Sequence, residues 1–247
     1  MNIESNLSFP GLLDGLESVF RLFFPTDNPL LAQFWVETRC NLKCGGCQIH
    51  EQPHKIYSDI NLAEMKAAII ALRKMRVRLL HLTGGETFLN PYLTELVLTA
   101  RSKDTLYSAI PIVTIVTNGI TLIEMSDTER KRVINGLSNS GLTHLSFSVD
   151  SLHWSNPQRR KTQLRALIAL SQEIAKYHII PTINWVLCST DNSDEVLDVA
   201  QQVISSGCHF NLLLYSSVGG EFSILNDNLI PTKVQVESIA QKLLTEK

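Results

Sequence analysis

The chain has 247 residues, of which 44% are hydrophobic and 19% are charged, a composition typical of a globular protein. The formal net charge of -2 provides no basic surface for nucleic acid, so we expect no nucleic-acid partner. No apolar stretch reaches the ~20 residues of a membrane-spanning helix. Residues 1–10 do not resemble a signal peptide, and three of the five cysteines are clustered. These features predict a cytoplasmic protein, in a compartment where thiols stay reduced.

In chain order, the first predicted element is a helix over residues 11–24, where apolar side chains recur at helical spacing until Pro25. We assign residues 1–33 to an N-terminal helical extension and residues 34–247 to one domain that ends in a helix. Strands are predicted at residues 34–39, 79–83, 112–117, 143–149, 180–188 and 210–215. Helices are predicted at about residues 62–75, 91–102, 127–138, 159–177 and 193–206, and from residue 232 onward.

The alternation of six strands with helices predicts parallel pairing, in either an open doubly wound sheet or a curved partial barrel. A polar face on two strands favours the barrel. Ser146, Ser148 and Asp150 share one face of the fourth strand, and Thr182 and Asn184 share one face of the fifth. A parallel sheet covered on both faces would be apolar on both. We therefore predict an α/β fold, a partial (β/α)6 barrel with a polar ligand at the carboxyl ends of its strands.

A loop directly after the first strand contains three cysteines, Cys40, Cys44 and Cys47. Thiolates at this spacing can converge on one [4Fe–4S] cluster and leave its fourth iron free for a ligand that is not protein. Zinc bound by Cys44, Cys47, His50 and His54 is an alternative, but it leaves Cys40 unexplained.

The ends of the next three strands carry residues suited to binding a ligand. Two glycines allow the backbone to approach a ligand closely, and a carboxylate beside them can bind an ammonium group. Taken alone, the glycines, the Asn-Gly pair and the Ser/Asp alternation are also explained by turns and hydration. The candidate residues are Gly84, Gly85, Glu86, Thr117, Asn118, Ser148 and Asp150, with Arg160 in the following helix. For Arg160, a surface arginine at a helix start is the alternative.

The cysteine loop, followed one βα unit later by Gly-Gly-Glu, resembles the motifs of the radical S-adenosylmethionine (SAM) superfamily. The resemblance covers about residues 34–220. It implies a cluster whose fourth iron binds the amino and carboxylate groups of SAM. The cluster ligands it implies are Cys40, Cys44 and Cys47. The residues implied for the amino end of SAM are Gly84, Gly85 and Glu86, and those for its ribose and carboxylate are Thr117, Asn118, Ser148, Asp150 and Arg160.

The resemblance also implies an activity. One electron from a flavodoxin- or ferredoxin-like donor would cleave SAM to a 5′-deoxyadenosyl radical, which abstracts hydrogen from the substrate or adds to it. A peptide or specialised metabolite is the first expected substrate, because the core looks closest to that branch. A lipid or isoprenoid is second, because of the apolar N-terminal helix and because Gly46, in place of the usual aromatic residue, resembles adenosyl-transferring hopanoid enzymes. An alternative of another class is a non-catalytic iron–sulfur or zinc-binding partner protein.

Further features depart from the family pattern or lie outside it. Thr87 replaces the proline that commonly follows Gly-Gly-Glu, and no cysteine follows Cys208, so we expect no auxiliary-cluster domain. Cys208 precedes the sixth strand and is predicted to be a buried small hydrophobe. Cys188 ends the fifth strand on the face of Asn184, where a thiol could give a hydrogen atom to a substrate radical; plain packing is the alternative.

Overall fold

The computed structural model describes residues 28–44, 47, 61–102, 109–215 and 227–245. Six parallel strands form one sheet in the order β1-β2-β3-β4-β5-β6. The strands are β1 Leu31–Glu37, β2 Leu79–Gly84, β3 Ile112–Thr117, β4 His144–Ser148, β5 Ile180–Leu187 and β6 His209–Leu214. The helices are α3 Leu62–Lys74, α4 Leu93–Arg101, α5 Ile120–Glu124, α6 Asp127–Asn139, α7 Pro157–Ala175, α8 Ser193–Ser205 and α9 Lys233–Thr245. Two 3₁₀ turns are η1 Thr87–Leu89 and η2 Asp227–Leu229.

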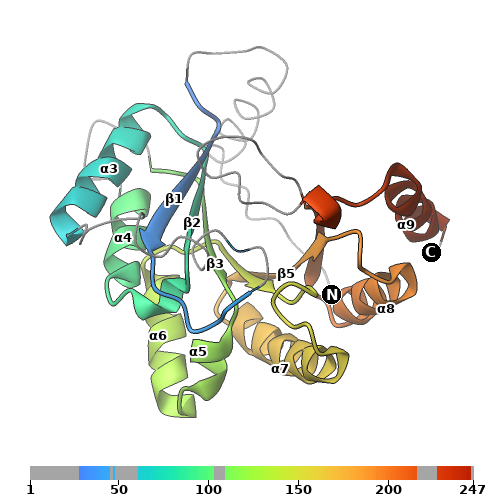
Figure 1. Cartoon of the computed structure of the whole chain (residues 1–247). Helices are drawn as coiled ribbons and strands as arrows, with labels where there is room; N and C mark the ends of the chain where they lie inside the picture. The colour runs from blue at the N-terminus through green and yellow to red at the C-terminus, as the bar shows by residue number, and fades with distance from the viewer. Residues whose placement is uncertain (1–27, 45–46, 48–60, 103–108, 216–226, 246–247) are drawn as a thin grey trace.

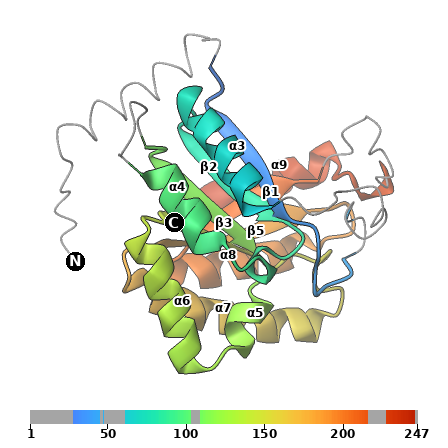
Figure 2. The ribbon, with the colours of Figure 1, turned by 90° about the vertical axis from the view of Figure 1, so that its left-hand side faces the viewer.

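The predicted alternation of six parallel strands with helices is confirmed. Each strand pairs with the next one along the chain, so right-handed crossovers advance in one direction and place the connecting helices on one face of the sheet. Figure 1 shows these helices around the outside of the strands, and Figure 2 shows α3 and α4 lying in front of β1 and β2. The sheet is open, with β1 and β6 as its two edges. The predicted helix at residues 11–24 lies outside the described residues.

The two faces of the sheet differ in polarity. The helix-covered face is apolar and fully buried, with side chains that include Leu82, Ile115, Phe147 and Trp185. Strand register aligns polar side chains on the opposite face, where His81 pairs with Thr114, Thr114 with His144, and Ser146 with Thr182. The alternation predicted for the fourth and fifth strands is therefore present, and it extends across neighbouring strands.

Local sequence signals set the helix boundaries that border the carboxyl edge of the sheet. Asn156 caps α7 by accepting a hydrogen bond from Arg159 N at 3.1 Å, and Pro157 occupies the first turn. α7 therefore begins two residues earlier than predicted, and residues 149–156 form the loop between β4 and α7. The five-residue helix α5 was not predicted because it is too short to show helical periodicity.

Gly119 permits the turn from β3 into α5. Its φ is 77°, and a Cβ there would lie 2.4 Å from Leu167 Cδ2. Within the described part of the chain, no helix has the length and hydrophobicity needed to cross a membrane.

Candidate functional site

The three clustered cysteines lie close together at the carboxyl end of β1. Leu42 N donates a hydrogen bond to Cys40 Sγ at 3.4 Å, and Cys47 N donates to Cys44 O at 3.3 Å. Burial, followed by the neighbouring thiols of Cys47 and Cys40, raises the pKa of Cys44 to about 12. The three thiols are therefore close enough for the charge on one to affect the pKa of another.

The two glycines at the end of β2 hold the segment that leads into the cysteine loop. Gly85 N donates to Glu37 O and Glu86 N donates to Arg39 O, both at 2.8 Å. A Cβ on Gly84 would lie 2.1 Å from Glu37 O, and one on Gly85 would lie 2.1 Å from Arg39 O. Such contacts are far too short for any side chain, so glycine is required at both positions. The group that lies close to the two glycines is the backbone at and after the end of β1. This packing role of the glycines could not be predicted from the sequence.

Glu86 forms a buried network with two other predicted site residues, Thr117 and Asn118. Its Oε1 accepts hydrogen bonds from Thr117 Oγ1 at 2.6 Å and from Phe88 N at 3.0 Å. Its Oε2 accepts one from Asn118 N at 3.0 Å. Asn118 Nδ2 in turn donates to Asn41 Oδ1 at 2.7 Å, inside the cysteine loop. The structure therefore brings the ends of β2 and β3 together with the cysteine loop.

Asp150 is the second fully buried carboxylate at this edge of the sheet. Its Oδ1 accepts hydrogen bonds from Leu152 N at 3.0 Å, His153 N at 3.2 Å and His153 Nδ1 at 2.8 Å. Its Oδ2 has no hydrogen-bond partner among the described residues. The negative charge of Asp150 contributes to the raised pKa of both Cys44 and Cys188. Asp150 thus lies between the cysteine loop and the end of β5.

His153 belongs to the site, although it is not among the residues predicted from the sequence. Burial alone would lower the pKa of His153, but the carboxylates of Asp150 and Glu86 outweigh burial and raise it. The Asp-x-x-His spacing after β4 was the available signal. Ser148, also predicted, is partly buried at the end of β4 in register with Asn184.

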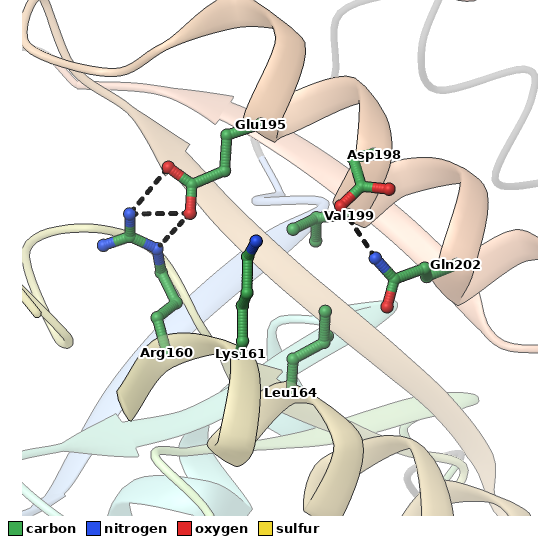
Figure 3. A pocket seen from close by; sticks show the side chains of 7 residues that line it. All are labelled: Arg160, Lys161, Leu164, Glu195, Asp198, Val199 and Gln202. Carbon is green, nitrogen blue, oxygen red and sulfur yellow. Dashed lines mark hydrogen bonds and ion pairs between the residues drawn. The ribbon is translucent and has the colours of Figure 1, made fainter. Parts of the chain in front are cut away.

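Arg160 was also predicted to be a site residue, but the structure places it away from the buried carboxylates of Glu86 and Asp150. Its Nη2 lies 2.7 Å from Glu195 Oε2, and its Nε donates to Glu195 Oε1 at 3.0 Å. Nη1 donates to Trp154 O, and the guanidinium stacks 5.4 Å from the Trp185 ring, on the helix-covered face. Figure 3 shows Arg160 and Glu195 facing each other beside a pocket between α7 and α8. The alternative interpretation as a surface arginine is wrong, because only 5% of the residue is exposed.

The other predicted cysteines are both buried. Cys188 is fully buried just after β5, and its thiol donates a hydrogen bond to Val186 O at 3.7 Å. Burial, then the charges of Asp191 and Asp150, raise the pKa of Cys188 to about 12, so its sulfur stays protonated. Cys208 is buried at the opposite end of the sheet, as predicted. His50 and His54, the other ligands of the zinc alternative, lie outside the described residues.

A family model described as the radical SAM superfamily matches residues 37–211, which is more than half of the chain. The chain belongs to the radical SAM superfamily. The chain is therefore a radical SAM enzyme, and the cofactors of this superfamily are a [4Fe–4S] cluster and SAM, as the motif resemblance implied.

The curated relatives include GTP 3′,8-cyclases. That of Chlorobaculum tepidum is 28% identical over 164 residues, covering 65% of this chain and 46% of the relative. That of Mycolicibacterium smegmatis is 23% identical over 232 residues, covering 88% of this chain and 61% of the relative. The chain therefore spans about half the length of these relatives.

Solved structures with the same fold include peptide-bound radical SAM proteins. Streptococcus suis SuiB bound to precursor peptide SuiA has a TM-score of 0.64 at 16% identity, covering 99% of this chain and 53% of SuiB. The protein anSMEcpe with bound AdoMet and Cp18Cys peptide has a TM-score of 0.60 at 15% identity, covering 87% of this chain and 59% of that one. At these identities the similarity establishes the fold.

The described residues fit the two cofactors of the family. A cubane cluster takes one thiolate on each of three irons, so its ligands surround it instead of meeting at one ion. Within the part of the chain that the structure describes, no group of three His, Cys, Asp or Glu side chains is placed to hold a metal ion. The unpaired Asp150 Oδ2 beside the cysteine loop is a buried acceptor suited to a ligand that donates a hydrogen bond.

Proposed function

We propose that this radical SAM enzyme acts on a polar substrate, either a peptide or a small metabolite. The observation that supports the proposal is the polar face of the sheet, opposite the helices. Thr114, Ser146, Thr182 and Asn184 are buried there, each 7% exposed or less. Hydroxyl and amide side chains can hydrogen-bond to water or to a polar ligand, so this face of the sheet suits a hydrated or hydrogen-bonding substrate. It is a poor lining for a lipid or isoprenoid, the second substrate class considered from the sequence.

In this proposal, three groups of residues surround the cofactors. The three cysteines would bind the cluster, while Gly84, Gly85 and Glu86 position the cysteine loop and the adjoining end of β3. When bound, the cluster and SAM would supply the one-electron reductive cleavage and the radical chemistry that modifies the substrate. Thr117, Asn118, Ser148 and Asp150 line the neighbouring strand ends, where they would exclude water and orient the ligand.

A flavodoxin- or ferredoxin-like protein is the proposed electron donor. Cys40 is exposed, so a cluster held by this cysteine would lie within reach of a protein docked on the surface. The alternative of a non-catalytic partner protein is less well supported. A scaffold without turnover would have no need to keep an unpaired, fully buried carboxylate oxygen beside the cysteine loop.

The test is an anaerobic assay of the reconstituted protein with SAM and dithionite, with 5′-deoxyadenosine measured by chromatography. We expect 5′-deoxyadenosine from the wild-type protein and from Cys208→Ala, a control that changes a buried cysteine far from the site. Cys44→Ala is expected to yield none and to bind less iron. A wild-type protein that binds zinc and no iron would overturn the proposal. Added peptides and polar metabolites that accelerate 5′-deoxyadenosine release would then identify the substrate class.

A further inference from the structure

We propose that the substrate carries an anionic group, a carboxylate or a phosphate, which binds between His81 and His144, beside Thr114, on the polar face of the sheet. This inference rests on the proposed function and names the chemical class of its substrate. The site lies in the amino-terminal half of the strands, so the reacting part of the substrate would extend towards the cysteine loop at their carboxyl ends.

The first observation is the charge composition of the strands. Strands β2 to β6 contain no Asp, Glu, Lys or Arg. Their ionisable side chains are His81, His144 and His209. An imidazole is either neutral or positively charged. A cationic ligand would therefore find no carboxylate on these strands, whereas an anionic group would meet side chains that can become positive.

Strand register places the three histidines on the polar face. His81 is aligned with Thr114, and Thr114 with His144, in one row across β2, β3 and β4. His209 is aligned with Thr182 in the neighbouring row. Adjacent strands are about 4.8 Å apart, so two strand spacings put the Cα atoms of His81 and His144 about 10 Å from each other. An oxyanion above Thr114 could receive a hydrogen bond from a ring on each side.

The three rings are near enough to influence one another. Burial, followed by the nearby rings of His209 and His81, lowers the pKa of His144. Burial also lowers the pKa of His81. These rings therefore favour the neutral form at neutral pH when no ligand is bound. An anion between them would offset their mutual repulsion and hold them as protonated N–H donors.

One nitrogen of His144 remains available for a ligand. Its Nδ1 lies 3.0 Å from Thr143 Oγ1. Thr143 gives its hydroxyl hydrogen to Val113 O at 2.7 Å, so Nδ1 must be the donor in the contact with His144. Nε2 forms no hydrogen bond with the described residues, and it becomes a second donor when the ring is protonated.

The hydroxyl groups of the same face are also available. Thr114, Ser146 and Thr182 are each 5% exposed or less. Within the part of the chain that the structure describes, their hydroxyls form no hydrogen bond. A hydroxyl can donate to water or to a ligand, so these three side chains add donors beside the imidazoles.

The buried carboxylates at the carboxyl edge determine the orientation of the substrate. Glu86 follows His81 by five residues, and Asp150 follows His144 by six. At about 3.3 Å per residue, the histidines lie about 15–20 Å from these carboxylates. An anionic group would be repelled by Glu86 and Asp150 and attracted to the histidines. The uncharged part of the substrate is thereby directed towards the cysteine loop.

The experiment measures binding of three probes to the anaerobically reconstituted protein by isothermal titration calorimetry. The probes are succinate, inorganic phosphate and succinamide, the neutral counterpart of succinate. We expect wild-type protein to bind at least one of the two anions about tenfold more tightly than succinamide, the effect of one hydrogen bond to a charged group. The anion that binds more tightly identifies the substrate group as a carboxylate or a phosphate.

The variants test the residues of the row. His81→Phe and His144→Phe keep a ring but remove its N–H donors, so each should weaken anion binding about tenfold and leave succinamide unchanged. Thr114→Val keeps the shape of the side chain and should weaken anion binding about threefold to tenfold. His178→Asn is the control, at an exposed histidine whose φ of 59° asparagine tolerates, and it should bind as wild type does.

Failure of this inference and failure of the proposed function give different results. A wild-type protein that binds zinc and no iron would refute the proposed function. A protein that holds its cluster but binds neither anion more tightly than succinamide would refute only the anionic class. Undiminished anion binding in the His81, His144 and Thr114 variants would also refute it. Circular dichroism and iron content establish that each variant is folded and loaded, and Thr114→Val decides the question where a phenylalanine disturbs the fold.

Discussion

Gly85→Ala is expected to detach the cysteine loop from the sheet while leaving most of the fold intact. The added Cβ would lie 2.1 Å from Arg39 O, so the backbone after β1 must move. That movement would break the hydrogen bond from Gly85 N to Glu37 O and the one from Glu86 N to Arg39 O, both 2.8 Å long. Overpacking costs about 1–3 kcal/mol, and each lost hydrogen bond about 1 kcal/mol. We therefore expect the free energy of unfolding to fall by about 3–5 kcal/mol.

The assay is urea unfolding followed by circular dichroism, together with iron content after anaerobic reconstitution. The matched control is Gly136→Ala in α6, where the nearest atom to an added Cβ is 3.8 Å away. Alanine in a helix interior is favoured over glycine by about 0.5–1 kcal/mol, so the control should be as stable as wild type or slightly more stable. Gly85→Ala should bind little iron. If it unfolds at the wild-type urea concentration and binds normal iron, the glycine does not position the cysteine loop.

Three further predictions concern charges and thiols. Glu195→Gln leaves the Arg160 guanidinium buried without its carboxylate, so the free energy of unfolding measured in urea should fall by about 3 kcal/mol. A fall of less than about 0.5 kcal/mol would contradict a structural role for this ion pair. The imidazole of His153, followed by NMR, should titrate above its usual pKa, and Asp150→Asn should lower that value. Because the folded pKa is raised, this ion pair stabilises the protein fully below about pH 6.5, and the stabilisation is lost as the pH rises through the folded pKa. With its pKa near 12, the Cys188 thiol should resist alkylation at pH 8 in the native protein. Cys188→Ala should change the yield or the stereochemistry of the product if this thiol supplies a hydrogen atom. An unchanged product would show that Cys188 serves only in packing.

The sequence alone determined the order of elements and the location of the site along the chain. Strand and helix periodicities are local patterns, and they placed all six strands within three residues of their observed starts. Parallel strands that alternate with helices bring their carboxyl ends to one edge, so the cysteine loop, Glu86 and Asp150 could be assigned to the same edge without coordinates.

Only the tertiary structure decided which partner each side chain takes. Glu195 lies 35 residues after Arg160, and their ion pair forms because α7 and α8 pack side by side on the helix-covered face. The need for Gly85 is set by the backbone that follows β1, far away along the chain. His153 becomes part of the site because a turn after β4 directs its ring onto Asp150 while Glu86 lies near enough to influence its charge. Spacing along a chain indicates which residues reach one edge of a sheet. Which neighbour pairs with a buried charged side chain depends on how the helices and strands pack in three dimensions.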